Sequence, residues 1–246
     1  MKRFLIVACV GAALGAIATT AFAADEEPEE LKGPWSGRIL GGYLATSGNT
    51  ENTAANLEAG VNWDGLRWHH ALSGRAIGQS TDKDTTAESY KATYEANFDL
   101  SDRTYLFGLL DYNKNRFSTY TQQTFQFAGI GRRFIMTDKH QLNAEVAAGL
   151  TQADIATGGS QDEFNWRVSG SYNWNITDTS RFTQTLGVNS GSSNTFTESV
   201  TEVAANIYGA LAMVLSYKIQ NNSDVLPGTD KTDTFAAINL EYAFGQ

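Results

Sequence analysis

The three histidines of the chain, His69, His70 and His140, are the residues that could support nucleophilic catalysis by a serine. Such a site needs the imidazole within hydrogen-bond reach of the hydroxyl that it deprotonates. Ser73 and His69 would share one face of an extended strand, and four residues of strand separate such side chains by about 13 Å. His70 lies beside the same short turn, and His140 follows another. We therefore expect no catalytic residues and no enzyme activity.

Metal and cofactor sites have equally little support. Asp82 and Asp84 could offer oxygen ligands to a hard cation. Two short acids in a polar segment are usually solvated, so we expect neither a metal nor a cofactor. Cys9 is the only cysteine, which excludes a disulfide within the chain and a thiolate metal site.

Charged residues recur at alternate positions within segments whose other positions are apolar. In 88–100, for example, Lys91, Glu95 and Asp99 alternate with tyrosine, alanine and phenylalanine. A strand turns successive side chains to opposite faces, so we assign the charged face to the lumen of a barrel. The residues assigned to this lumen are Glu58, Arg67, Arg75, Lys91, Glu95, Asp99, Asp111, Glu145, Arg167, Glu198, Glu202, Lys218 and Glu241.

The elements that would position these charges are strands. From Trp35 onward, period-two alternation is sustained, whereas no window has helical periodicity. The predicted strands are 35–47, 53–63, 66–78, 88–100, 104–114, 121–135, 140–153, 163–175, 180–190, 197–207, 210–221 and 232–244. The fold class is therefore all-β, an antiparallel up-and-down barrel of about twelve strands.

The connections between these strands alternate in length. The short ones are 64–65, 101–103, 137–139, 176–179 and 208–209, and the longer ones are 48–52, 79–87, 115–120, 154–162, 191–196 and 222–231. An even strand number, with both ends of the barrel beside short turns, is typical of bacterial outer-membrane barrels. We expect the short turns to face the periplasm and the longer loops to face the exterior.

Aromatic residues gather near both ends of the predicted strands. Those near short turns are Trp63, Trp68, Phe98, Phe134, Trp174, Phe182, Tyr208, Tyr242 and Phe244, and those near longer loops are Tyr43, Tyr90, Tyr112, Phe117, Phe164 and Phe196. Two such rings with aliphatic residues between them fit the two interfaces of a membrane. This pattern predicts contact with outer-membrane lipids and lipopolysaccharide.

The composition agrees with a folded, exported barrel. The 246 residues are 41% hydrophobic and 11% aromatic, which is incompatible with a disordered chain. The net charge of −9 gives no electrostatic footprint for nucleic acid.

The N-terminus has the pattern of a secretory signal. Lys2 and Arg3 precede the apolar run 4–18, and a small-residue cleavage site follows at 21–23. We predict a signal peptide at 1–23, an acidic periplasmic tail at 24–34 and an outer-membrane β-barrel at 35–246. Insertion would then require the barrel-assembly machinery of the outer membrane.

The alternation is irregular in 121–135. Phe125 and Phe127 favour one face, whereas Ile130 and Phe134 favour the other. A β-bulge at 129–131 would reconcile them. The register of the first strand, 35–47, is similarly open.

Several short motifs resemble one family of Gram-negative outer-membrane proteins. In order along the chain they are GYLATSGNTEN at 42–52, YEANFDL at 94–100, GIGRRF at 129–134, KTDT at 231–234 and NLEYAF at 239–244. Their order resembles the YdiY-like family of salt-induced outer membrane proteins, whose domain has no established function. The resemblance implies the barrel fold and the outer membrane, with no substrate and no catalytic residues. Such proteins usually end on the aromatic, whereas Gly245 and Gln246 follow Phe244 here.

Three functions remain open on the sequence. The first is an integral outer-membrane barrel that forms a narrow channel for ions or small solutes, linked to salt or envelope stress. The second is a structural barrel with a closed lumen and no transport. The third, a membrane-embedded hydrolase, is disfavoured by the histidine positions. The eight acids and five bases assigned to the lumen predict that cations pass more easily than anions.

Overall fold

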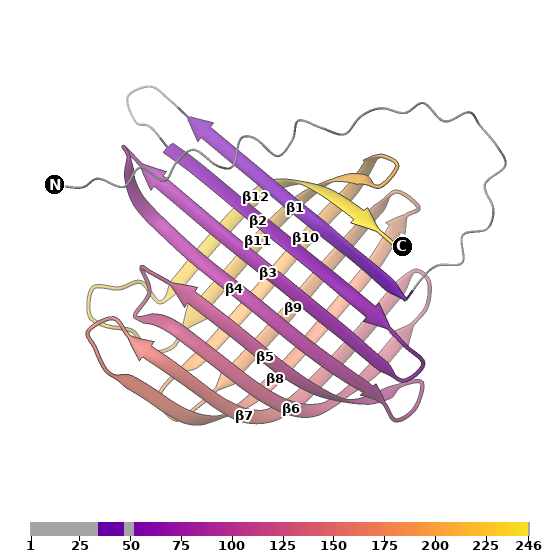
Figure 1. Cartoon of the computed structure of the whole chain (residues 1–246), viewed down its shortest axis with the longest axis horizontal. Coiled ribbons are helices and arrows are strands. Elements are labelled where there is room, and N and C mark those ends of the chain that lie inside the picture. The colour runs from indigo at the N-terminus through magenta and orange to yellow at the C-terminus, as the bar shows by residue number, and fades with distance from the viewer. Residues whose placement is uncertain (1–33, 47–51, 246) are drawn as a thin grey trace. The chain divides into compact units, whose positions relative to one another are not determined.

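The computed structural model describes residues 34–46 and 52–245, which form twelve antiparallel strands (Figure 1). The strands are β1 Trp35–Thr46, β2 Asn52–Asp64, β3 Trp68–Thr81, β4 Asp84–Asp99, β5 Thr104–Asn115, β6 Tyr120–Met136, β7 His140–Ile155, β8 Ser160–Thr177, β9 Ser180–Ser190, β10 Thr195–Tyr208, β11 Leu211–Asn222 and β12 Thr232–Phe244. The predicted signal peptide and residues 24–33 of the predicted acidic tail lie outside the described residues. In the described part of the chain, no helix is long and apolar enough to cross a membrane.

Each strand pairs with its neighbour in sequence, and β1 pairs with β12, so the sheet closes into a barrel. The closing pair runs in register from Gly37 opposite Phe244 to Gly41 opposite Leu240. A closed sheet satisfies the backbone groups of every strand within the barrel, as a membrane interior requires. The prediction of an antiparallel twelve-stranded barrel of the outer-membrane type is confirmed.

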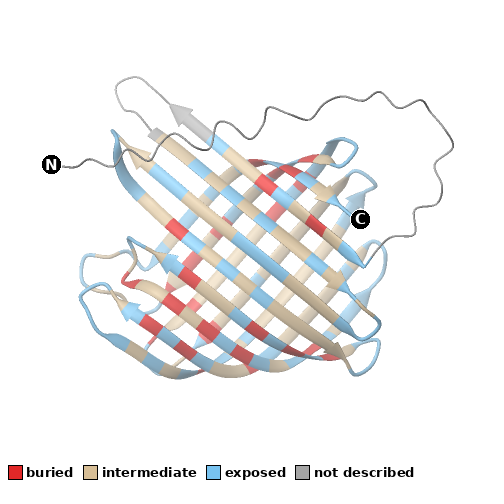
Figure 2. Ribbon diagram, viewed as in Figure 1, coloured by how far each residue is buried: buried red, intermediate tan, exposed pale blue. Residues whose placement is uncertain are grey.

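The outward face of the barrel is apolar. Buried and exposed positions alternate along the strands (Figure 2). Large aliphatic side chains stand roughly half exposed on the outside of eight strands: Leu57, Leu72, Leu106, Leu110, Val146, Leu150, Val168, Leu186, Met213, Leu215, Ile238 and Leu240. A continuous apolar surface of this kind suits contact with hydrocarbon rather than water.

The connections opposite the short turns are shorter than predicted. The segment predicted as a loop at 79–87 is a two-residue hairpin, because β3 and β4 remain paired as far as Thr81 opposite Asp84. Its central residues, Asp82 and Lys83, both have positive φ, 51° and 72°. Such turns match the right-handed twist of a hairpin. The predicted loop was wrong because the strands continue beyond the length that crosses a membrane. Of the described connections at this end, 223–231 is the longest.

The irregularity in β6 also differs from the prediction. Residues 129–131 pair continuously with both neighbouring strands, and the register shift in that half of the strand lies just after Arg133. Phe125 and Phe127 are 2% and 4% exposed and face the interior, whereas Phe134 is 52% exposed on the outside. The bulge predicted near 129–131 therefore lies a few residues further on, at Phe134, and it is not what separates the two faces, because Phe125 and Phe127 face the interior.

Closure predicts unusual resistance to denaturing detergent. The folded protein should run on SDS gels as a compact species until it is boiled, and should then shift in apparent mass. The physical reason is that a sheet with no free edge offers no strand from which unfolding can begin. Identical migration of boiled and unboiled samples from a folded membrane fraction would contradict the barrel.

The lengths of the connections at the two ends of the barrel predict which end faces the exterior. A cysteine replacing Thr229, in the longest connection, should react with an impermeant maleimide on intact cells. A cysteine replacing Asp138, in a short turn at the other end, should react only after the outer membrane is permeabilised. Cys9 lies within the predicted signal peptide, so the wild-type mature chain is the unlabelled control. Labelling of position 138 on unbroken cells would reverse the orientation.

Candidate functional site in the barrel lumen

Lys91 on β4 and Glu198 on β10 meet inside the barrel, with 2.7 Å between Nζ and Oε1. These two strands are six positions apart in either direction around the closed sheet, so the ion pair spans the lumen. Lys91 also lies 3.1 Å from Asp111 on β5. Glu198 accepts a hydrogen bond from Gln220 and lies 3.5 Å from Nζ of Lys218, both on β11.

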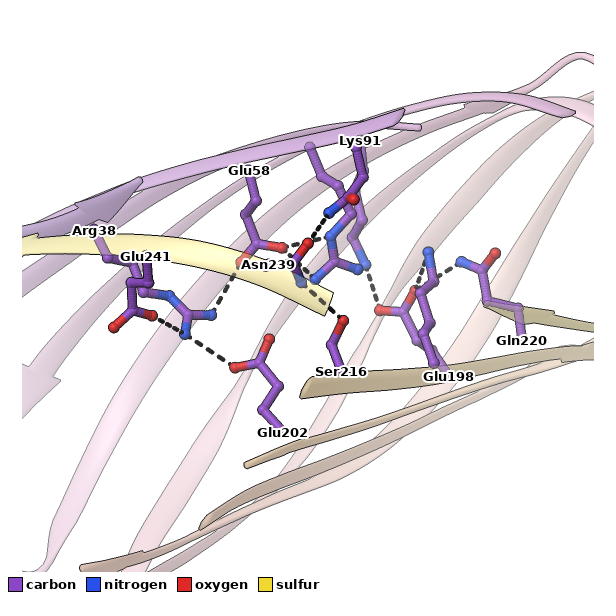
Figure 3. Close-up of polar contacts among 12 residues, drawn as sticks. Arg38, Glu58, Lys91, Glu198, Glu202, Ser216, Gln220, Asn239 and Glu241 are labelled. Carbon is purple, nitrogen blue, oxygen red and sulfur yellow. Dashed lines mark hydrogen bonds and ion pairs between the residues drawn. The ribbon is translucent and has the colours of Figure 1, made fainter. Parts of the chain in front are cut away.

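A second group of ion pairs is centred on Arg38 of β1. Its guanidinium lies 3.0 Å from Glu58, 2.9 Å from Glu202 and 3.4 Å from Glu241. Glu58 also binds Arg75 on the neighbouring strand. Figure 3 shows Arg38 and Glu58 on one side of the lumen and Glu202 opposite them.

Arg38 and Arg181 take part in these contacts but were absent from the sequence-based assignment. Arg181, just after a short turn, donates to Glu241. Arg38 lies on the first strand, whose register the sequence left open. The alternation of Ile39 and Tyr43 was the available signal, because both are exposed outward and place Arg38 on the inner face.

Among the acids assigned to the lumen from the sequence, Glu95 and Glu145 are the two that join no ion pair within the described residues. Glu145 accepts hydrogen bonds of 2.8 Å from the Tyr105 hydroxyl and from Ser169. Glu95 accepts one of 2.8 Å from Asn97. Neither of these two carboxylates is therefore bound by a base.

Of the other residues assigned to the lumen, Arg167 lies inside it and Asp99 lies at the short-turn end. Arg167 donates to Asn189 within the lumen, 2.8 Å away. Asp99, at the short-turn end, is bound by Arg133 at 2.9 Å and by His69 at 3.1 Å. The structure does not bring Arg67 to these groups. Its guanidinium donates to the backbone oxygen of Asp99 and covers the Phe98 ring at 4.5 Å, because it lies in the turn before β3.

An aromatic cluster fills one side of the lumen. Its members come from β5, β6, β7 and β10: Tyr105, Phe107, Leu109, Phe125, Phe127, Ala147 and Phe196. Phe196 was predicted to join an interfacial ring, but it is 7% exposed and packs on Phe125 with ring centroids 5.8 Å apart. Tyr105 crosses Gly131 on its way to Glu145, and a Cβ at Gly131 would collide with its ring. Glycine is therefore required at this position.

The remaining space in the lumen is divided into three parts. A central cavity of 320 Å³ lies between the two groups of ion pairs. A vestibule of 1120 Å³ occupies the short-turn end and is lined by Arg181, Glu241 and Lys139, among others. At the opposite end only 10 Å³ remains among asparagine, glutamine and aromatic side chains such as Asn165 and Phe125, which is room for about one water molecule.

The connection 223–231 crosses this narrow end. The backbone N–H of Leu226 donates to the Thr119 hydroxyl at 3.1 Å, and Thr119 precedes β6 on the opposite side of the barrel. The side-chain oxygen of Asn194 accepts from Ser223 and from the N–H of Asp224, each at 3.2 Å. Uncharged hydrogen bonds therefore hold this segment over the mouth.

The histidines have partners other than a nucleophile. His69 contacts Asp64 at 2.8 Å in addition to Asp99. His70 and His140 bind the hydroxyls of Tyr94 and Tyr172, at 2.9 and 2.8 Å. None of the described histidine rings is hydrogen-bonded to a serine, and Ser73 instead lines the central cavity. No group of three histidine, cysteine or acidic residues that could hold a metal occurs within residues 34–46 and 52–245.

Comparison with solved structures supports the fold. The NanC porin has a TM-score of 0.50 and 11% identity, covering 84% of this chain and 97% of its own. An outer membrane channel from Pseudomonas putida F1 has a TM-score of 0.52 and 8% identity, covering 89% of this chain and all of its own. At these identities the similarity concerns the fold alone.

Comparison of sequences identifies the family. The chain is 29% identical over 224 residues to the uncharacterized protein YdiY of Escherichia coli (strain K12), which covers 90% of this chain and 88% of that protein. The family model described as "Protein of unknown function, DUF481" matches residues 41–244. The match extends from β1 to the end of β12, so the chain belongs to the DUF481 family.

Proposed function

We propose that this protein resides in the outer membrane of a Gram-negative bacterium and forms a narrow passage for ions or small solutes. The observation that carries the proposal is the central cavity. The charged side chains around it keep part of their surface accessible, 31% for Arg38, 18% for Lys91 and 17% for Glu198. If these side chains served only to fill the barrel, they would pack against one another, as side chains do in narrower barrels.

The passage is closed at rest in this proposal. The Lys91–Glu198 ion pair blocks its middle, and 223–231 covers its narrow end. The ion pair is in contact with the cavity, so ions that enter the cavity at high salt compete with Lys91 and Glu198 for each other and open the pair more often. This dependence on ionic strength agrees with a role in the response to salt or envelope stress.

The surroundings of the barrel follow from the same proposal. Outer-membrane lipids and lipopolysaccharide cover its apolar belt, and the barrel-assembly machinery inserts it. Its chemistry is passage rather than catalysis, since no histidine among the described residues is hydrogen-bonded to a serine that it could activate.

A structural barrel without transport is the second candidate. It is favoured by the Lys91–Glu198 ion pair, because this pair joins opposite walls, and by the small volume, 10 Å³, of the pocket at the loop end. Conductance separates the two functions. The refolded protein in a planar bilayer should carry current that rises more steeply than salt concentration. No current between 0.1 M and about 1 M salt would favour the structural barrel.

Removal of the central ion pair should enlarge the conductance. The double variant Lys91→Met with Glu198→Gln neutralises one base and one acid together, so the net charge of the lumen stays the same, and Asp111 and Lys218, which each lose a partner, have opposite charge. We expect a several-fold larger single-channel current at low salt and a weaker dependence on ionic strength. The matched control is Arg116→Met with Glu88→Gln, which removes an ion pair of 3.0 Å at an exposed arginine. Equal currents from both double variants would exclude the central pair as the barrier.

The selectivity of the passage should depend on Glu95 and Glu145. Arg38 and Arg181 offset part of the negative charge that the sequence predicted, so these two acids without a base carry the preference for cations. Glu95→Gln with Glu145→Gln should move the reversal potential in a salt gradient toward zero. Asp162→Asn, at an exposed position of β8, should leave it unchanged. Anion preference in the wild type would contradict this assignment.

A further inference from the structure

The two walls of the central cavity carry opposite charge. Arg38, Glu58, Arg75 and Lys91, on β1 to β4, give one wall three bases and one acid. The facing wall contributes Glu198 and Glu202 from β10, with no base among its cavity-lining residues. Across a space of 320 Å³, a net charge of +2 therefore faces a net charge of −2 (Figure 3).

Two ion pairs join these walls, Arg38 with Glu202 at 2.9 Å and Lys91 with Glu198 at 2.7 Å. Between the charges, the lining consists mainly of hydroxyl side chains: Ser73, Thr93, Thr183 and Thr185. The hydroxyls can donate or accept hydrogen bonds, so they adapt to a ligand group of either charge. The cavity therefore offers a cationic wall, an anionic wall and adaptable groups between them.

A solute entering this cavity must replace the protein's own contacts. A simple anion can bind Lys91, but it takes this base from Glu198, which then keeps only the more distant Lys218, 3.5 Å away, and weakening the pairing of a charge away from bulk water is costly. A simple cation has the converse defect. An uncharged solute satisfies neither wall. A molecule with both an ammonium and a carboxylate can exchange two contacts for two, because each of its charges meets the complementary wall.

We propose that the central cavity is a binding site for a small zwitterion of the α-amino acid class. It enters the Lys91–Glu198 ion pair, so that its carboxylate binds Lys91 and its ammonium binds Glu198, while Arg38 and Glu202 keep their own pair. The volume of 320 Å³ is at the lower end for small-molecule sites, which fits a ligand of amino-acid size. This inference rests on the proposed passage and names the solute class that it would carry.

The wild-type protein tests the proposal directly. Radiolabelled glycine is equilibrated by dialysis with the refolded full barrel in detergent at low salt, and unlabelled competitors are added. Alanine should displace glycine, whereas acetate and methylammonium, which each carry one of its charges, should be at least about tenfold weaker. Glycerol should not displace it. No saturable glycine binding, or displacement by acetate or methylammonium as effective as by alanine, would overturn the proposal.

Variants locate the binding and separate it from transport. Lys91→Met with Glu198→Gln should weaken glycine binding at least about tenfold, whereas Arg116→Met with Glu88→Gln should leave it unchanged. Glu198→Gln alone, a single change at the residue that binds the ammonium, supplies the test if the double variant does not refold, and it should weaken binding too. Unchanged binding in every folded cavity variant would place the site elsewhere and overturn the assignment. Saturable glycine binding without conductance would refute the passage but support the binding site. Conductance without glycine binding would support the passage but refute the binding site.

Discussion

Charged side chains inside a barrel of this width must find partners across the lumen, and this constraint organises the interior. Eight strands enclose a space that side chains fill, and sixteen leave an open channel, so twelve is intermediate. Lys91 reaches from β4 to β10 on the far side of the barrel, and Arg38 on β1 reaches β10 across the two strands between them. Each ion pair forms only if its two residues lie at the same level along the barrel axis. The register of the closed sheet therefore determines which charges meet.

The rest of the lumen is arranged around these pairs. On β5, β6 and β7 an aromatic cluster occupies the space that no charge spans. Tyr105 belongs to that cluster, yet its hydroxyl binds Glu145, so the apolar and polar parts are joined through one side chain. The central cavity lies beside the bridging pairs, and uncharged hydrogen bonds hold 223–231 over the narrow mouth. An ionic barrier and an uncharged one therefore stand in series.

The sequence predicted the fold well because alternation determines the face of each residue in a long regular strand. Glu58, Lys91 and Glu198 were assigned to the inner face from this pattern alone. Their partners could not be predicted, since Lys91 and Glu198 are 107 residues apart and meet only through the stagger of the closed sheet. Alternation does not show which face is apolar where both faces carry aromatic residues, as they do around Phe125 and Phe127. Arg67 was assigned to the lumen for a different reason, because the predicted strand began at residue 66, whereas Arg67 lies in a turn.

The central claim is that Lys91 and Glu198 interact across the lumen, and a double-mutant cycle measures this interaction directly. The free energy of unfolding in urea is determined in lipid vesicles for the wild type, Lys91→Met, Glu198→Gln and the double variant. We expect a favourable coupling energy of about 1–3 kcal/mol, because residues in one ion-pair network are not additive. The coupling should fall as salt is raised. Additive effects of the two substitutions at low salt would contradict the account.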